Sequence, residues 1–167
     1  FGIAAGVAQR VEASLSLPLI LHQVAEYPGL DLGAVDGRGP GDLGVEIQAQ
    51  IIDTSQAPVD VSVAVPLTFP TSGGQDWRGY GAMTGGLDVA VSQERGPIRL
   101  AAVLGYRAQP QAEVFNFDVG HKLLWRLAMG VALPDQPWDL TVEHVGSTRA
   151  GAPFSDPDET PGELVVA

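Results

Sequence analysis

The chain of 167 residues contains no cysteine and few basic residues. Without cysteine it has no disulfide framework, no thiolate metal site and no cysteine nucleophile. Nine lysines and arginines stand against 20 aspartates and glutamates, so the chain lacks the basic surface that a nucleic-acid partner requires. No segment of it reaches the roughly 18 to 20 consecutive apolar residues of a membrane-spanning helix. Thiol chemistry and charge-driven nucleic-acid binding are therefore excluded.

Charge of either sign is also scarce, whereas apolar residues are abundant. Hydrophobic residues make up 45% of the chain and charged residues 17%, against about 25% charged residues in an average soluble domain. The formal net charge is −11. A surface that faces water on all sides normally needs more charges than this chain carries.

The apolar residues recur with a period of two. The segment Val59–Phe69 reads VDVSVAVPLTF, which places its large apolar residues on one face of a strand and its polar and small residues on the other. Several such segments have 9 to 11 residues, which is longer than usual in soluble sheets and suits a tilted strand that crosses a bilayer. The other predicted strands are Val11–Leu21, Val45–Ile51, Gly85–Val91, Ile98–Tyr106, Leu123–Leu133 and Trp138–Val142, with a weaker one at Phe1–Val7 and one that starts at Leu164.

Short and long connections alternate between these strands. The short ones are Ala8–Arg10, Asp53–Pro58, Gln93–Pro97 and Pro134–Pro137. The long ones are Gln23–Asp42, Pro70–Gly81, Ala108–Gly120 and Ser147–Gly162. In an up-and-down meander this alternation places all turns at one end and all long loops at the other, which is typical of outer-membrane barrels. The sequence therefore predicts an all-β, antiparallel, up-and-down transmembrane β-barrel.

Aromatic residues gather where such a barrel would meet the two membrane interfaces. Phe69, Tyr80, Tyr106 and Trp125 fall near the long-loop ends of their strands, and Trp138 marks the short-turn end. We predict that these five are interface aromatics. The alternative is that aromatic residues simply favour strands and loop edges.

The polar face of the strands is ordered by the sign of its charges, which we predict to line the lumen. Acidic residues come from three consecutive strands and basic residues from the next two. They are Glu46, Asp60 and Asp88, followed by Arg99, Arg107, Lys122 and Arg126. If the sheet closes, the two walls either create a transverse field across an open pore or form salt bridges that plug a narrow lumen. On a soluble sheet the same residues would be ordinary solvated charges.

Several stretches resemble a known family. GDLGVEIQAQII, VDVSVAVPLTFPTSGG, GPIRLAAVLGYRAQPQAEV, GHKLLWRLAMGVAL and LTVEHVGST, in this order, resemble the amino-terminal β-barrel region of OmpA-family outer-membrane proteins of myxobacteria and related bacteria. The motifs are Gly41-Asp42-Leu43, Pro66–Ser72 and Arg99–Arg107, with Ser72 where the family tends to have glycine. The resemblance implies the bacterial outer membrane as location, and the lipid bilayer, lipopolysaccharide and other envelope proteins as partners. It also implies a longer precursor with calcium-binding repeats and a peptidoglycan-binding domain.

Nine predicted strands are an odd number, whereas bacterial barrels contain an even number. We therefore expect residues 1–167 to form a single β-barrel domain that is incomplete at both ends, a fragment with about eight or nine strands of a larger barrel.

No catalytic pattern stands out. His22, His121 and His144 are isolated, and neither an HExxH nor a GxSxG motif occurs. Asp156, Asp158 and Glu159 fit no EF-hand spacing. We predict a non-enzymatic protein without cofactor or metal, which serves porin-like solute passage or structural envelope anchoring. The alternative is a secreted, soluble β-sandwich that binds carbohydrate or acts in adhesion.

Overall fold

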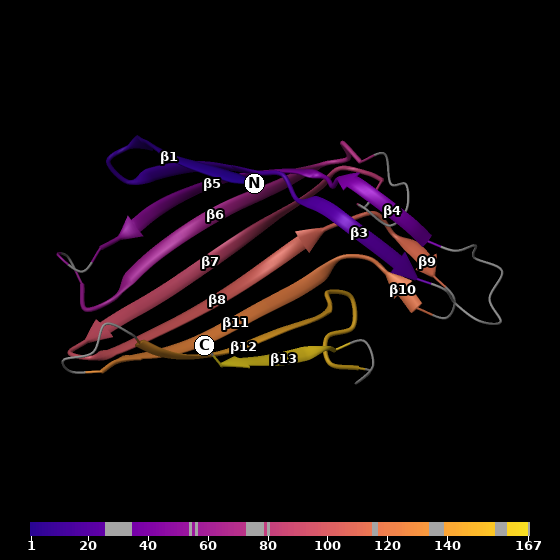
Figure 1. Cartoon of the computed structure of the whole chain (residues 1–167). Coiled ribbons are helices and arrows are strands. Elements are labelled where there is room, and N and C mark those ends of the chain that lie inside the picture. The colour runs from indigo at the N-terminus through magenta and orange to yellow at the C-terminus, as the bar shows by residue number, and fades with distance from the viewer. Residues whose placement is uncertain are drawn as a thin grey trace.

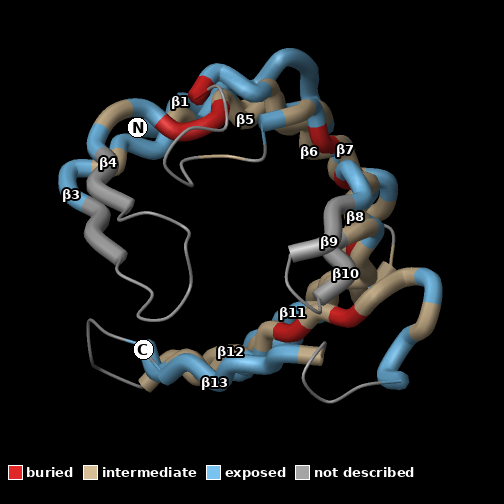
Figure 2. Tube along the Cα trace, turned by 90° about the vertical axis from the view of Figure 1, so that its right-hand side faces the viewer, coloured by how far each residue is buried: buried red, intermediate tan, exposed pale blue. Residues whose placement is uncertain are grey.

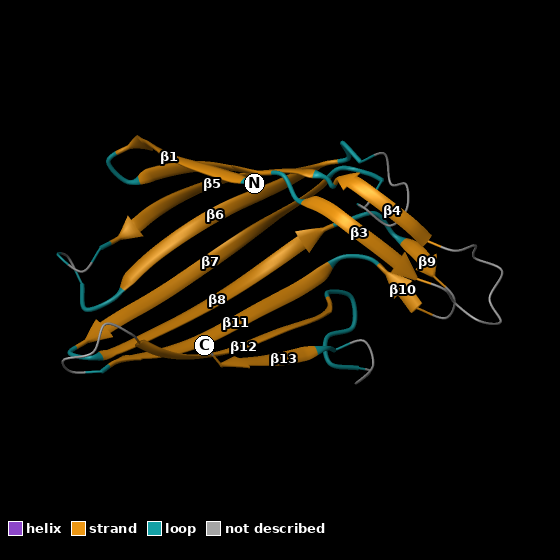
Figure 3. Ribbon diagram, in the orientation of Figure 1, coloured by secondary structure: helices purple, strands orange, loops and turns teal. Residues whose placement is uncertain are grey.

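The computed structural model describes residues 1–25, 35–53, 55, 57–72, 79, 81–114, 117–133, 139–155 and 160–166. In these ranges every regular element is a β-strand (Figure 3). The same ranges hold no helix of the length and hydropathy needed to cross a membrane.

Nine strands form one antiparallel sheet in the order β1-β2-β5-β6-β7-β8-β11-β12-β13 (Figure 1). Each overlaps one of the nine predicted strands, so the prediction of an all-β antiparallel meander is confirmed. Their bounds are β1 (Gly2–Ala8), β2 (Val11–Ser16), β5 (Leu43–Ile52), β6 (Asp60–Phe69), β7 (Thr84–Arg95), β8 (Ile98–Ala108), β11 (Lys122–Ala132), β12 (Asp139–Arg149) and β13 (Gly162–Val166).

Two separate two-stranded ribbons occupy segments that were predicted mainly as long loops. One pairs β3 (Leu19–Ala25) with β4 (Val35–Pro40), and the other pairs β9 (Ala112–Val114) with β10 (Phe117–Val119). Both extend beyond one end of the sheet (Figure 1). The predicted strand Val11–Leu21 is therefore divided. Pro18 lies at the division, where its missing N–H suits the end of pairing.

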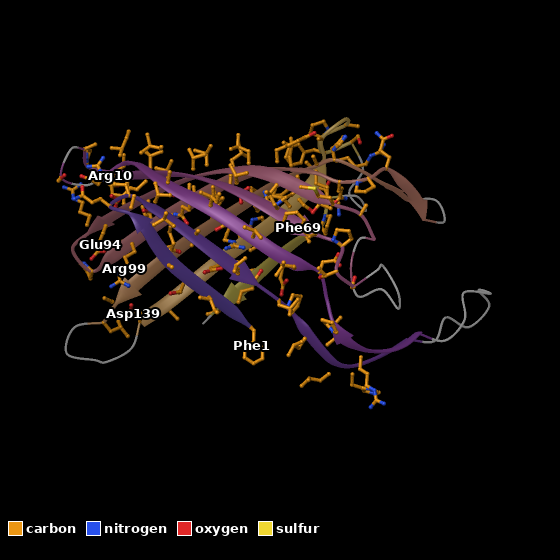
Figure 4. All side chains as sticks on the ribbon, turned by 90° about the horizontal axis from the view of Figure 1, so that it is seen from above. Phe1, Arg10, Phe69, Glu94, Arg99 and Asp139 are labelled. Carbon is orange, nitrogen blue, oxygen red and sulfur yellow. The ribbon has the colours of Figure 1, made fainter. Side chains whose placement is uncertain are left out.

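The turns lie at the opposite end. Figure 4 shows Arg10, Glu94, Arg99 and Asp139 together at the turn end and Phe69 at the other end. A two-residue turn joins β7 to β8, where Arg95 pairs with Ile98 and Gly96 adopts a φ of 60°. A glycine at the first turn position permits this left-handed conformation.

The sheet curls without closing. Its edge strands β1 and β13 are not hydrogen-bonded to each other, and Figure 2 shows the opening between them. Because an odd number of strands lies between these edges, β1 and β13 run in the same direction and cannot close the sheet by antiparallel pairing. The antiparallel sheet is thus established, whereas the closed barrel is not formed by the described residues.

Strand register keeps the two faces of the sheet distinct. On one face Val63 pairs with Val89, and Val89 pairs with Leu104. These apolar residues are open to the surroundings, with Leu104 63% exposed and Val89 40% exposed. In the part of the chain that the structure describes, the largest fully buried side chain is that of Thr148. Within the described ranges, the apolar side chains of this face are thus not covered by a second layer of the chain.

Candidate functional site

The polar face lines the concave side of the curled sheet. One hollow of about 360 Å³ is lined from β5, β6, β7, β8, β11 and β12, and its lining includes Glu46, Asp88, Arg107 and Arg126. This hollow draws together polar-face side chains of six strands. A second hollow of about 460 Å³, at the turn end, is lined by Asp60 among others. A larger one, of about 520 Å³, lies over the apolar face and is lined by Leu100, Leu127 and His144 among others. We call the concave surface the inner face and the apolar surface the outer face.

Asp88 and Arg107 form a bidentate ion pair between β7 and β8. Nη2 of Arg107 donates to Oδ2 of Asp88 at 2.7 Å, and Nη1 donates to Oδ1 of the same carboxylate. The side chains are 17% and 28% exposed. A Cβ on Gly105 would collide with the Asp88 carboxylate, and a Cβ on Gly86 would collide with Arg107. The pair therefore lies flat along the wall, over two glycines.

Arg99 forms a more exposed set of ion pairs near the turn end. Its Nη1 lies 3.1 Å from Oδ2 of Asp139, and its Nε lies 3.6 Å from Oε2 of Glu94. To reach Asp139 on β12, Arg99 crosses β11 at Gly130, which is its register partner. A Cβ on Gly130 would make only ordinary contacts, so this pair does not depend on a glycine as Asp88–Arg107 does. Because all three charged side chains are largely exposed, the pairs contribute little stability.

Glutamine side chains on β5 bind neighbours on β6. Gln50 Nε2 donates to Asp60 Oδ1 at 3.2 Å, and Gln48 Nε2 donates to Ser62 Oγ at 3.1 Å. These amides satisfy polar groups of the inner face and hold them against the wall.

All seven residues predicted to line the lumen lie on the inner face, although the structure pairs only some of them. Asp88 pairs with Arg107, and Arg99 pairs with Asp139 and Glu94. Glu46, Lys122 and Arg126 have no hydrogen bond or ion pair within the described ranges. Sequence reasoning did not select the glycines beneath the Asp88–Arg107 pair, because a glycine in an alternating strand carries no local signal of what lies above it.

Two of the three motifs of the family resemblance meet at the long-loop end. Asp42, from Gly41-Asp42-Leu43, accepts hydrogen bonds from the N–H of Ser72 at 3.1 Å and from its Oγ at 2.6 Å. Thr71 Oγ1 accepts from the N–H of Leu43 at 2.9 Å and donates to the carbonyl of Gly41 at 3.0 Å. Asp42 and Ser72 are buried. This clasp joins the start of β5 to the end of β6, with the carboxylate supplied by Asp42 and its donors by Ser72.

Three of the five predicted interface aromatics are described, and all three lie on the outer face. Phe69 ends β6 and pairs with Leu43. Tyr106 stacks on His121 with ring centroids 5.8 Å apart, and Trp125 lies on β11. Tyr80 and Trp138 lie outside the described residues.

A scan against protein-family models finds no match for this chain, and no curated protein is significantly similar to it. The resemblance to OmpA-family barrels therefore stays a prediction, and it rests on the sequence motifs alone. Within the described ranges no group of three or more acidic or histidine side chains is placed to hold a metal ion. Asp156, Asp158 and Glu159 lie outside those ranges.

Proposed function

We propose that the protein belongs to the bacterial outer membrane, where its strands span the bilayer as part of a β-barrel and its inner face lines a water-filled passage for solutes. The observation that carries this proposal is the inverted placement of polarity. Large apolar side chains are exposed on the outer face, whereas the charged side chains line the concave side. A lipid solvent favours this arrangement, and water opposes it.

The charges near the outer face support the same conclusion. An arginine or lysine on a lipid-facing surface costs about 2–4 kcal/mol at the bilayer midplane and much less near the interfaces. On the outer face of β7, Leu87, Val89 and Val91 are apolar. The first charged residue on this face is Arg95, which lies at the turn. The lipid bilayer and lipopolysaccharide are the partners that this surface fits.

The ion pairs favour an open passage over a plugged lumen. Asp88–Arg107 joins adjacent strands, and Arg99–Asp139 spans a single intervening strand. Both pairs thus run along the wall rather than across the concave space. Glu46 and Arg126, which are unpaired within the described ranges, line the same hollow and can attract or repel charged solutes there.

Two adjacent residues of β7 provide the test. Because the chain has no cysteine, a thiol introduced at Val89 or at Ala90 can be labelled alone. On a protein reconstituted in vesicles, we expect brominated lipids to quench a bimane fluorophore at V89C. Aqueous iodide should quench the same fluorophore at A90C. Equal iodide quenching at both positions, with none by lipid, would instead support the soluble sheet of the sandwich alternative.

Passage and anchoring are distinguished by conductance. We expect the protein in planar bilayers to give ion currents that change when Arg126 is replaced by glutamate. A protein that inserts in the bilayer but conducts in neither form would point to the envelope anchor.

A further inference from the structure

The connection that follows β12 folds back over the outer face of the sheet. Thr148 belongs to this face because it pairs with Leu123, which pairs with Tyr106. The N–H of Phe154 donates to Thr148 Oγ1 at 2.9 Å, and Thr148 is only 2% exposed. The ring of Phe154 lies 5.5 Å from that of Trp125. The connection therefore covers Thr148 from outside and places an aromatic ring beside Trp125.

Phe154 holds this position in an unfavourable conformation. Its φ is 57°, and no other non-glycine residue of the described ranges has a positive φ. Left-handed backbone is rare for a bulky residue and persists where the surroundings impose it. Nevertheless the side chain stays 66% exposed. Burial within the chain thus does not account for the placement of this ring.

Trp125 and His144 form the other half of the same surface. Their rings are stacked 6.4 Å apart, and Trp125 Nε1 donates to His144 Nδ1 at 3.3 Å. Trp125 lies over Gly146, where a Cβ would collide with the indole. Because Nδ1 accepts this bond, the proton of the neutral imidazole is on Nε2.

Nε2 of His144 is a donor without an acceptor. It has no hydrogen-bond partner among the residues that the structure describes, and the side chain is exposed on the outer face. Its register partners on either side are Leu127 and Leu164, which are 52% and 66% exposed. With the outer face in lipid, this N–H would be costly without an acceptor, so the site calls for one from outside the chain.

We propose that Trp125, His144 and Phe154 bind the glycerol and phosphate region of a membrane lipid. This proposal rests on the proposed function, because it requires the outer face to lie in a bilayer. Nε2 of His144 donates to an ester or phosphate oxygen, while the rings of Trp125 and Phe154 lie at the membrane–water interface, where aromatic side chains are favoured. The continuity of the site with the exposed apolar face selects a lipid over a soluble ligand.

Depth-dependent quenching tests the location of Phe154. Phe154→Trp is made in a chain whose three tryptophans are replaced by phenylalanine, and Val89→Trp in the same background is the mid-strand control. In lipid vesicles we expect bromines close to the headgroups to quench F154W more strongly than bromines deep in the tails, with the reverse order for V89W.

The outcomes separate the two proposals. If V89W is quenched and F154W is not, the lipid site is wrong and the membrane-spanning sheet stands. If neither tryptophan is quenched, the proposed function is wrong as well.

The donor role of His144 has its own measurement. After extraction in detergent, native mass spectrometry should show phospholipid retained by the unaltered chain, and much less retained by His144→Leu. The matched control is Val65→Ala, on the same face but away from the site, which should retain phospholipid fully. Equal retention by H144L and the unaltered chain would overturn the hydrogen bond to lipid.

Discussion

On strand β7, Val89 and Ala90 are adjacent in sequence but belong to two different surfaces. Val89 is 40% exposed and lies between Val63 and Leu104 on the outer face. Ala90 lies between Ser62 and Val103 on the inner face. The outer face contains large apolar residues without partners, whereas the inner face contains small residues and charges.

The comparison shows that the two faces place different demands on a side chain. Over most of the outer face the requirement is apolarity, because side chains such as Val89 and Leu104 meet the surroundings rather than another layer of the chain. On the inner face the requirement is size and position. Asp88 and Arg107 lie flat only because Gly86 and Gly105 leave the space above them free. The outer face should tolerate changes of shape, and the inner face should tolerate changes of polarity.

The largest expected effect distinguishes the faces by charge. Val89→Arg should destabilise the membrane-inserted protein by about 2–4 kcal/mol, because the new charge would face lipid. Ala90→Arg should have a much smaller effect, because its side chain would enter the aqueous space. Heat-modifiable migration on a gel measures both. Equal assembly of the two variants would contradict the assignment of the faces.

A smaller effect is expected from filling the inner face. Gly105→Ala should destabilise the sheet by about 1–3 kcal/mol, because the added methyl group displaces the Asp88–Arg107 pair. Gly6→Ala is the control, since a Cβ on Gly6 meets nothing within 4 Å. Thermal unfolding in detergent measures the difference. If G6A costs as much as G105A, the space above Gly105 is not what the pair requires.

Neutralising unpaired charges should change selectivity rather than stability. Glu46→Gln should shift the reversal potential in planar bilayers toward anion preference, and Arg126→Gln toward cation preference. Each shift should correspond to at most about 1 kcal/mol, since water screens both groups. Arg99→Gln should shift it less, because Arg99 is paired with Asp139 and Glu94. Shifts of the same sign for E46Q and R126Q would be incompatible with oppositely charged walls.

The smallest effect concerns the turn at Asp53, outside both faces. The hydroxyl of Ser55 lowers the pKa of Asp53, against an opposing effect of desolvation, and the Ser55 N–H and Arg10 lower it further. Because the pKa is lower in the folded state, the ionised carboxylate stabilises the turn at pH values above the pKa of the unfolded chain. This contribution is lost as the pH falls through the pKa of the folded state. Ser55→Ala should raise the pKa of Asp53, as followed by NMR titration. An unchanged pKa would remove Ser55 as the main cause.

Local alternation was enough to determine the nine strands, the two faces and the sign of the charges on the inner face. Each depends on residues close in sequence, because a period of two assigns every side chain to a face within one strand. The hydrophobic pattern of Val59–Phe69 predicts β6 in this way, and β6 spans Asp60–Phe69. The ribbons β3–β4 and β9–β10 were missed, because neither segment has a sustained alternation.

Only the tertiary structure decided which residues meet. Asp88 forms its ion pair with Arg107 because the β7–β8 register places Gly105 opposite Asp88 and Gly86 opposite Arg107. Asp42 accepts hydrogen bonds from Ser72, thirty residues later in the chain, because β5 and β6 pair antiparallel. Phe154 reaches Trp125 through a backbone conformation that its own sequence disfavours. Register and chain reversal bring distant residues together, and alternation within one strand carries no information about either.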